Sequence, residues 1–515
     1  MVGVDTRAFY TRTILILLFI AMFSGGLFVF SKNESFIKNF KVYYANAYIH
    51  IWQQKLNNFI NLTPTVQASE KSTLSDSIPV LMYHGIVDKP DGSNVTLEDF
   101  ADQMYRMKQA GYQTITNTQF ASYMRGEITL PSKSFMITFD DGRKDSFYPV
   151  DPILKELGYT ATFYIITGTL DKPGNSFHMT KEELKDIMKT GRWELQPHAY
   201  NGHGVIKIDK EGNTGHFYSN KQWLDDKNRL ETDEEYTRRV EDDIRKAIED
   251  MTEYFGVDSL SFAIPFGDFG QRISNYGDAP MVMQKVLDDF DIFSFYQTPD
   301  PFNFNYPLSG DDVSMVTRIK VEPGWNGESL YSQIKFGAEK DFPYQLTKGN
   351  SGKGWVKMWG KVSAIDNKIH LEPSADNTGS GAILVGTKTW TNYRINTDIN
   401  WLAGSNFSVM ARAVNHNNYV AVTVTKDLIR IEQKSNGERK ILKEIKNSYG
   451  IKPGTHHLEI IVFGNYLFAM IDHRVIIDAD NISPNLSHGG IGYMSWDLLK
   501  GIANAEITSI SVNKY

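Results

Sequence analysis

Two adjacent carboxylates follow an apolar run in the first half of the sequence. Asp140 and Asp141 come directly after SFMITF (134–139), and Gly142 follows them. Asp and Gly favour tight reversals of the chain, so one interpretation is a turn. The other is a catalytic pair, in which one carboxylate binds a metal ion and its neighbour accepts a proton. The positions of the other reactive residues distinguish a turn from a catalytic pair.

Two histidines and a Pro-Phe-Gly motif end two further predicted strands. His198 ends WELQPH, His203 comes five residues later, and SFAIPFG ends in Pro265, Phe266 and Gly267. The carboxyl ends of parallel barrel strands meet at one face, where such domains place their chemistry. Two histidines and one aspartate form a mixed N/O set that suits Zn²⁺ or a similar divalent ion. Each motif alone is common, but their joint position at strand ends favours a metal site.

The elements that would position these residues alternate between strand and helix. Short β-rich runs such as IPVLMYHGI, SFMITF and TATFYIIT are separated by segments with apolar residues at three- and four-residue steps. Thr96 is the expected N-cap of one such helix. The alternation predicts parallel strands joined by crossover helices. We therefore expect residues 78–343 to form a (β/α) barrel or a related α/β fold.

The last part of the chain has a different pattern. Residues 344–515 consist of short alternating runs broken by Gly, Asn and Asp, which predicts an antiparallel, all-β sandwich. Aromatic residues there are candidates for sugar contacts, although most aromatics of a β-sandwich belong to its core.

The N-terminus carries a candidate membrane anchor. Residues 13–30 hold no charge, and 18 helical residues span about 27 Å, close to the hydrocarbon thickness of a bilayer. Arg7 and Arg12 precede them, which favours a cytoplasmic N-terminus and an exported remainder. A cleaved signal peptide is the alternative, but no small-residue cleavage site follows. We expect a cytoplasmic tip and transmembrane helix over 1–31, then a stalk helix and linker over 32–77.

Composition narrows the function further. The formal net charge of −7 gives no basic field, so nucleic acid is not an expected partner. The chain has no cysteine, so any metal must be held by His, Asp or Glu.

The motifs together resemble the polysaccharide deacetylases, carbohydrate esterase family 4. TFDDG, a strand ending H-x4-H, and FAIPFG match the family signature over about residues 78–322. VLMYHGI and the segment after the histidines look most like the branch that acts on poly-β-1,6-N-acetylglucosamine and related biofilm exopolysaccharides. The resemblance implies a distorted (β/α)7 barrel, and the C-terminal pattern looks like a concanavalin-like jelly roll of the laminin-G type, a candidate glycan-binding module.

The resemblance also implies roles for single residues. Asp140 would be the catalytic base, and Asp141, His198 and His203 would bind the metal, most often zinc, with cobalt or nickel as alternatives. A carboxylate bound to a cation is a poor base, which agrees with this division. The family places a backbone N–H that stabilises the oxyanion at the aromatic residue of its third motif, here Phe266.

The sequence departs from the family pattern at two places. They leave undetermined which group is the general acid and which residue contacts the catalytic base. The late histidine that donates a proton in many relatives is missing, because VSMVTRIKVEPGW contains none, and Arg318 cannot give up its proton. Either another group serves as the acid, with His84 as the candidate, or water does. The alternative role for His84 is that of a structural histidine or a partner of the site residues. Ala263 stands where many relatives have Arg, so the usual contact to the base is expected to be missing.

Four residues are candidates for substrate contacts. Trp193 and Tyr200 flank the histidines and are expected either to wall a sugar subsite or to pack in the core. Pro265 and Phe266 would line the same subsite.

The sequence thus predicts a metal-dependent N-deacetylase of an extracellular amino-sugar polysaccharide, either a biofilm exopolysaccharide or a cell-wall glycan. It would be anchored in the cell membrane and would work with exopolysaccharide synthesis or export machinery. One alternative is a non-catalytic exopolysaccharide-binding protein with a vestigial barrel, which the missing late histidine favours. Another is a glycoside hydrolase with Asp140 and Asp141 as its acid pair, although adjacent residues at a strand end diverge in direction.

Overall fold

The structure is a computed structural model that describes residues 45–46, 74–75, 77–170, 172, 176–271, 273–297, 304–307, 315–347 and 354–515. The chain divides into two compact units, one of residues 1–299 and 307–331, the other of residues 300–306 and 332–515. The expected anchor and nearly all of the expected stalk lie outside the described residues. Within the described ranges, no helix is long and apolar enough to cross a bilayer.

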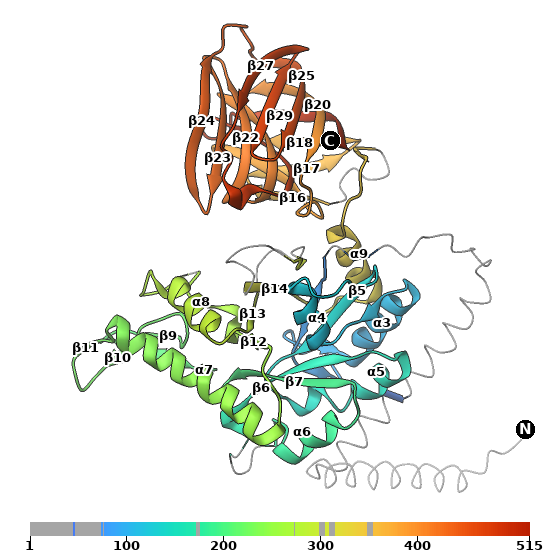
Figure 1. The fold of residues 1–515 in the computed structure, drawn as a ribbon, viewed down its shortest axis with the longest axis vertical. Coiled ribbons are helices and arrows are strands. Elements are labelled where there is room, and N and C mark those ends of the chain that lie inside the picture. Colours follow the sequence, from blue (N-terminus) through green and yellow to red (C-terminus); the bar gives the residue numbers. More distant parts are fainter. Residues whose placement is uncertain are drawn as a thin grey trace, which may run out of the picture. The chain divides into compact units, whose positions relative to one another are not determined.

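Seven parallel strands form the centre of the first unit, in the order β12-β13-β14-β1-β5-β6-β7 (Figure 1). The strands are β1 (Val80–Tyr83), β5 (Ser134–Phe139), β6 (Ala161–Ile166), β7 (Trp193–Ala199), β12 (Ser261–Ala263), β13 (Phe293–Gln297) and β14 (Met315–Lys320). A short strand, β4 (Gln113–Thr114), pairs with β5 outside this order. Most strand residues are buried on both faces, as expected for a parallel sheet covered by helices.

A glutamine side chain links the two end strands of this order. Gln196 on β7 accepts hydrogen bonds from the backbone N–H groups of Leu260 (2.8 Å) and Ser261 (2.9 Å), at the start of β12. The ring Nδ1 of His198 donates to the carbonyl of Ala263 on the same strand, at 2.6 Å. Side chains thus bridge the seam where β7 and β12 face each other. The first unit is a nearly closed parallel (β/α) barrel, as the sequence predicts.

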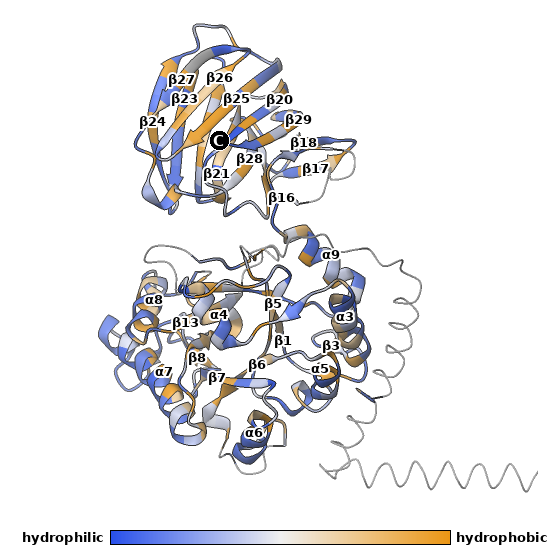
Figure 2. Ribbon diagram, turned by 45° about the vertical axis from the view of Figure 1, so that its right-hand side comes forward, coloured by the Kyte–Doolittle hydropathy of each residue, from blue (hydrophilic) through white to orange (hydrophobic). Residues whose placement is uncertain are grey.

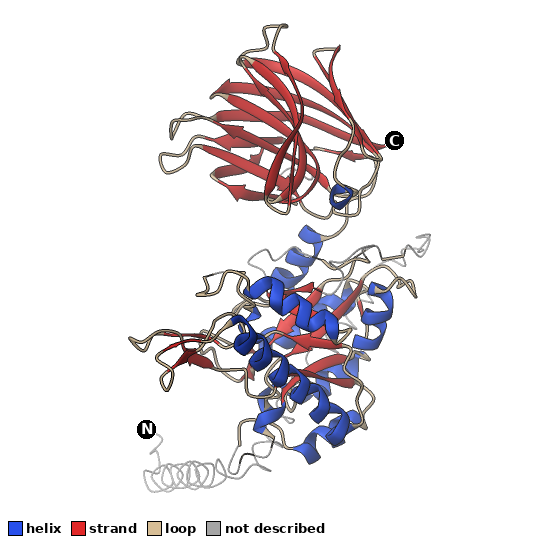
Figure 3. Cartoon of the chain, turned by 60° about the vertical axis from the view of Figure 1, so that its left-hand side comes forward, coloured by secondary structure: helices blue, strands red, loops and turns tan. Residues whose placement is uncertain are grey.

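Helices surround this barrel, and several begin at a threonine (Figure 3). They are α3 (Leu97–Gln109), α4 (Asn117–Met124), α5 (Asp151–Leu157), α6 (Lys181–Met188), α7 (Asp233–Phe255), α8 (Ala279–Asp289) and α9 (Gly327–Gly337). Thr96 caps α3 by accepting from the N–H of Asp99, as predicted, and Thr232 forms a capping box with Glu235 at the start of α7. Figure 2 shows hydrophobic and hydrophilic residues on α3 and α7, the pattern of helices that cover a core.

Two small hairpins, which the sequence pattern did not reveal, lie between β7 and α7. They pair β8 (Val205–Lys207) with β9 (Thr214–His216) and β10 (Trp223–Leu224) with β11 (Arg229–Leu230). Their strands are two or three residues long and partly exposed, so they lack an apolar alternation.

The second unit is a sandwich of two antiparallel sheets, as the sequence predicts. One sheet has the order β17-β18-β29-β20-β25-β26-β27, with β15 beside β29, and the other has the order β16-β19-β28-β21-β22-β23-β24. The strands of the first are β15 (Tyr344–Gln345), β17 (Lys361–Ile365), β18 (Lys368–Glu372), β20 (Tyr393–Ala403), β25 (Gly454–Phe463), β26 (Tyr466–Ile471), β27 (Arg474–Ala479) and β29 (Asn504–Lys514). Those of the second are β16 (Trp355–Trp359), β19 (Gly379–Leu384), β21 (Asn406–Asn415), β22 (Asn418–Thr425), β23 (Leu428–Ser435), β24 (Glu438–Lys446) and β28 (Gly490–Trp496).

We predict that Gln196→Leu lowers the free energy of unfolding by about 1–3 kcal/mol, because the N–H groups of Leu260 and Ser261 lose their buried acceptor. Chemical denaturation measures this loss. Gln113→Leu, at an exposed position of β4, is the control and should change stability by less than about 0.5 kcal/mol. Equal stability of the two variants would show that the amide does not hold the seam.

Candidate metal centre

The register of the barrel brings the residues after β1 and β5 to the same level. Tyr83, the last residue of β1, is paired with Phe139, the last residue of β5. The N–H of Asp140 donates to the carbonyl of Tyr83 at 3.1 Å. His84 and Asp140, the first residues beyond the two strands, therefore enter the carboxyl-end face of the barrel side by side.

Asp140 is a buried carboxylate held by a buried arginine. The two guanidinium Nη atoms of Arg318, on β14, donate to the two carboxylate oxygens of Asp140 at 2.6 and 2.7 Å. Both residues are only 2% exposed. Burial by itself raises the pKa of Asp140, but the charge of Arg318 outweighs it and leaves the pKa below its ordinary value. Asp140 is therefore ionised at neutral pH.

Asp141 points to a different set of partners, because the backbone turns sharply at this residue. Its φ is 72°, in the left-handed region that short polar side chains such as Asp tolerate. Its Oδ1 atom lies 3.5 Å from Nε2 of His198 and 3.2 Å from Nε2 of His203. One ligand atom from each of these three residues lies within 4.8 Å of the other two. The chain turn separates the two neighbouring carboxylates into two environments.

The chemistry of this trio fits a divalent cation. The carbonyl of Ala263 can only accept, so His198 carries a proton on Nδ1 and offers an Nε2 lone pair when it is neutral. The Oδ1 atom of Asp141 is buried and has no hydrogen-bond partner, which is the state of an acceptor that needs a cation. Burial raises the pKa of Asp141, but the two imidazoles hold it well below the usual range. Two imidazole nitrogens and one carboxylate oxygen are a ligand set that zinc accepts.

Two further predicted site residues border this trio. Burial lowers the pKa of His84, while the negative charges of Asp140 and Asp141 oppose that shift. Phe266 is 42% exposed, has a φ of 59°, and places its ring 4.8 Å from the ring of His203. Pro265, the preceding residue, is buried. His84 and Phe266 thus reach the trio from different strands, one after β1 and the other after β12.

The structure decides between the two roles expected for Trp193 and supplies one contact that was expected to be missing. Trp193 is 3% exposed at the beginning of β7, where it packs against aromatic rings and donates from Nε1 to Asp151. We therefore assign Trp193 to core packing rather than to a sugar subsite. The contact to the base, expected to be missing because residue 263 is Ala, is supplied by Arg318 instead. Tyr200 is half-buried just beyond β7, and its role as a sugar contact stays a prediction.

The role of Arg318 was missed because the sequence prediction considered it only as a proton donor. The absence of an arginine at position 263 was the available signal, since a buried base in the barrel still needs a cationic partner. The candidate site of the first unit is thus a divalent-metal centre at the carboxyl-end face of a (β/α) barrel, with a second, arginine-bound acid beside it.

Comparisons with known proteins identify similar enzymes. Residues 127–279 match the family model for polysaccharide deacetylase. The chain is 31% identical over 121 residues to a poly-beta-1,6-N-acetyl-D-glucosamine N-deacetylase of Staphylococcus aureus (strain MRSA252), covering 23% of this chain and 41% of the relative. It is 24% identical over 203 residues to the protein of that name from Escherichia coli (strain K12), covering 36% of this chain and 30% of the relative.

A solved structure, IcaB from Ammonifex degensii, is similar over 50% of this chain and 98% of its own, with 23% identity and a TM-score of 0.39. The chain spans less than half the length of the two curated relatives above. It contains a domain of the polysaccharide deacetylase family, whose members are hydrolases that act on N-acetyl sugars.

We predict that the protein binds one Zn²⁺ per chain at this trio and that His198→Gln weakens the affinity at least about 100-fold, because one of three ligands is lost. Asp140→Asn should change the affinity by less than about tenfold, since the ligands remain. Isothermal titration of the metal-free protein measures both. Equal losses in the two variants would make Asp140 a metal ligand as well and contradict its separation from the trio.

We also predict that Arg318→Met destabilises the metal-free protein by about 3–5 kcal/mol at pH 7.5, because a buried carboxylate loses its partner. In the wild type the folded pKa of Asp140 is depressed, so its contribution is fully present above the unfolded value and is lost only as the pH falls through the folded value. In the variant, burial raises that pKa, so acidification to pH 4.5 should relieve at least about 1 kcal/mol of the penalty.

Urea unfolding at the two pH values, with a chelator present, measures the difference between wild type and Arg318→Met. Arg125→Met is the control, because Arg125 forms an exposed pair with Asp291 at 3.6 Å. A wild-type–variant difference that stays constant between the two pH values would contradict the assignment of Arg318 to the ionised form of Asp140.

Proposed function

We propose that this protein is a metal-dependent N-deacetylase that removes acetyl groups from an N-acetylated amino-sugar polysaccharide outside the cytoplasm. The observation that carries the proposal is the division of labour between neighbouring acids. Asp141 faces two imidazole nitrogens, and these three residues would hold the metal. Asp140 is instead bound to Arg318 and is left to act as a base. The family domain supports an amide of an N-acetyl sugar as the substrate.

Asp140 would act as the base that takes a proton from the attacking water. Arg318 keeps it ionised, and a carboxylate has about four lone-pair sites, so a bidentate guanidinium leaves others for a water proton. Arg318 also fixes the plane of the carboxylate through its two bonds. The low pKa makes Asp140 a weak base, so it suits a water that is already acidified.

A divalent ion held by Asp141, His198 and His203 would supply that acidification and would polarise the acetamide carbonyl. The backbone N–H of Phe266 would donate to the oxygen that becomes negative as the tetrahedral carbon forms. His84, beside Asp140 at the end of β1, would then protonate the leaving sugar amine. Collapse gives acetate and a free amine on the polymer.

The surroundings of this chemistry are part of the proposal. The charge-free N-terminal segment 13–30 would anchor the protein in the cell membrane, with both folded units outside the cytoplasm. Poly-β-1,6-N-acetylglucosamine is the favoured substrate because the two relatives named above carry that polymer in their names. Proteins that synthesise or export the polymer would be the expected partners.

The β-sandwich would contribute glycan binding, and among its large aromatics Trp496, which is 37% exposed, would be a platform for a sugar face. Trp390 and Trp401 are buried in its core, and Tyr419 is only 8% exposed. A cavity of about 640 Å³ offers a polar alternative. Its lining includes Gln433, Lys440, Asn465, Asn481 and Ser483, whose amide, ammonium and hydroxyl groups suit sugar hydroxyls.

The alternatives from the sequence fit the geometry less well. In a glycoside hydrolase both carboxyl groups face one glycosidic bond, whereas Asp140 and Asp141 serve separate cationic partners. In a vestigial, non-catalytic barrel nothing would favour keeping a buried Asp141 between two imidazoles. Its Oδ1 atom has no hydrogen-bond partner there, which is unfavourable unless a cation binds. The non-catalytic interpretation would require that the assembled site never turns over substrate.

We predict that the full-length protein releases acetate from N-acetylglucosamine oligomers, that a chelator abolishes the release, and that zinc restores it. Asp140→Asn should lower the rate at least about 100-fold, because general base catalysis contributes factors of that order. Enzymatic measurement of free acetate is the assay, and Asp288→Asn, an exposed acid of α8, is the matched control. Zinc binding without any acetate release would favour the polysaccharide-binding alternative, and release in the presence of the chelator would remove the metal from the mechanism.

A further inference from the structure

Phe266 has a backbone conformation that a bulky residue rarely adopts. Phe266 lies between Pro265 and Gly267, and its φ and ψ are 59° and 2°. A non-glycine, bulky residue at positive φ is an outlier, and such conformations persist only where the surroundings hold them. Two backbone bonds close the turn, from Gly267 N–H to Ile264 at 2.9 Å and from Asp268 N–H to Pro265 at 3.3 Å. Neither bond fixes the side chain of Phe266.

The ring of Phe266 is held between two histidines. On one side lies the metal ligand His203, with ring centroids 4.8 Å apart and planes at 41°. On the other side lies His216, stacked at 4.2 Å with the planes only 9° apart. Because Phe266 is 42% exposed, this sandwich, rather than burial in a core, is what fixes its ring. His203 belongs to the metal trio, whereas His216 is outside it.

A buried acid fixes the orientation of His216. Its Nδ1 lies 2.6 Å from Oδ2 of Asp268, which is two residues beyond Phe266 and only 5% exposed. Ser219 donates to the same oxygen at 3.1 Å, and the N–H of Gly270 donates to Oδ1 at 3.1 Å. The carboxylate therefore ties His216 to the turn that carries Phe266, so that ring and turn form one unit.

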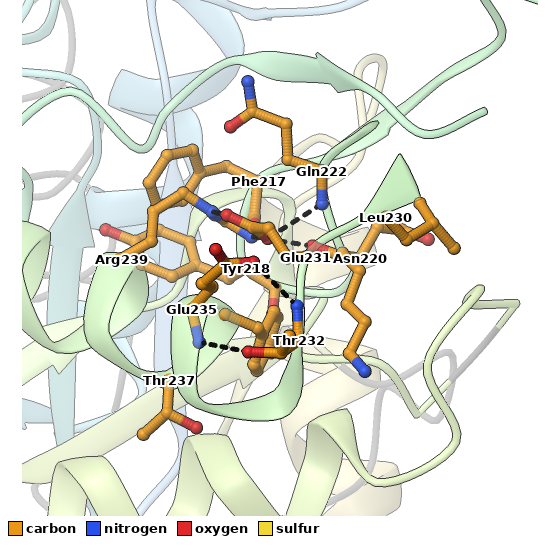
Figure 4. A network of polar contacts seen from close by, with 12 residues as sticks. Phe217, Tyr218, Asn220, Gln222, Leu230, Glu231, Thr232, Glu235, Thr237 and Arg239 are labelled. Atoms are coloured by element: carbon orange, nitrogen blue, oxygen red, sulfur yellow. Dashed lines mark hydrogen bonds and ion pairs between the residues drawn. The ribbon is translucent and has the colours of Figure 1, made fainter. Parts of the chain in front are cut away.

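The segment that carries His216 is itself fixed to α7 by the polar network of Figure 4. Arg239 on α7 donates to the carbonyls of Phe217 and Asn220, each at 2.8 Å. It also pairs with Glu231, which in turn accepts from the N–H of Gln222 at 2.8 Å. Phe217, directly after His216, lies under the Arg239 guanidinium at 4.2 Å. The chain directly after His216 is thus fixed to α7, and His216, the last residue of β9, stacks on Phe266.

We infer that His216, oriented by Asp268, is a positioning residue that clamps Phe266 and thereby aims its backbone N–H into the site. The effect of the clamp on catalysis rests on the proposed function. The contact between His216 and Phe266 does not, because it is a property of the fold. A donor that stabilises a developing oxyanion has to be held in place before the reaction, and a residue at positive φ relaxes once its clamp is removed. His216 does not replace a metal ligand or the base in this role.

Two variants separate the ring of His216 from its polar end, and a third serves as the control. His216→Phe keeps an aromatic ring for the stack but loses the bond to Asp268, and His216→Asn keeps a polar partner for Asp268 but loses the ring. Val205→Ala is the matched control, because Val205 is the cross-strand partner of His216 and its residue is 59% exposed. All are made in the full-length protein, with thermal unfolding recorded for each.

The catalytic measurement is kcat and KM for acetate release at saturating zinc. We expect His216→Asn to lower kcat at least about tenfold with KM changed less than about threefold, because an oxyanion donor acts in the transition state. Val205→Ala should stay within about threefold of the wild-type kcat, and His216→Phe, which keeps the stack but loses the bond to Asp268, should fall between the wild type and His216→Asn. The zinc affinity of all variants should stay within about threefold. A wild-type kcat in His216→Asn, equal losses in the Phe and Asn variants, or a change confined to KM would each overturn the inference.

A second measurement needs no turnover, so it distinguishes failure of the clamp from failure of the proposed function. Hydrogen exchange of the peptide that covers residues 264–270 should be at least about tenfold faster in His216→Asn than in the wild type, with His216→Phe between the two. Unchanged exchange there, or faster exchange confined to the β8–β9 hairpin, would show that His216 only anchors the hairpin. A wild type that releases no acetate but shows the predicted exchange would refute the proposed function and leave the clamp standing.

Discussion

The need to give two neighbouring, buried carboxylates separate cationic partners governs this barrel. Ionised side chains taken from water lose several kcal/mol of solvation each unless a partner compensates them, and two like charges side by side make that loss larger. The structure meets this constraint by turning the chain at Asp141, whose φ is 72°. Asp140 receives the guanidinium of Arg318, and Asp141 receives two imidazoles. One acid can therefore bind a cation while the other remains a base.

The rest of the barrel can be understood as the support for that division. The pairing of Tyr83 with Phe139 sets the ends of β1 and β5 level, which brings His84 beside Asp140. The seam contacts of β7 with β12 place His198 next to the strand that leads into Phe266. The hairpin after β7 adds His216, whose ring stacks on that of Phe266. The reactive groups thus reach the site from several strands, so their relative positions depend on closure of the sheet.

The sequence predicted the parts of this arrangement that have local signals. Buried strands such as 134–139 read as apolar runs, Thr96 was recognised as a helix cap, and Asp141, His198 and His203 stood at strand ends that a parallel sheet must gather on one face. The antiparallel sandwich could also be predicted from the sequence, because its strands alternate in polarity and are separated by turn residues.

The parts that depend on strand order were not visible in the sequence. Arg318 and Asp140 are 178 residues apart, and they meet because β14 pairs with β1, an order that local patterns do not encode. Trp193 looked like a neighbour of the histidines, but it starts the strand that His198 nearly ends, so it lies in the core. The stack on Phe266 was hidden because β8 and β9 are too short to carry an apolar period.

X-ray absorption spectroscopy at the zinc edge, combined with a crystal structure of the zinc-loaded protein, tests the central claim most directly. The account predicts two nitrogen ligands at about 2.0–2.1 Å from His198 and His203 and an oxygen ligand at about 2.0–2.2 Å from Asp141. It also predicts that Asp140 remains paired with Arg318 and outside the coordination sphere. An ion bound by Asp140, or one that Asp140 and Asp141 share, would contradict the separation of the two acids on which the mechanism depends.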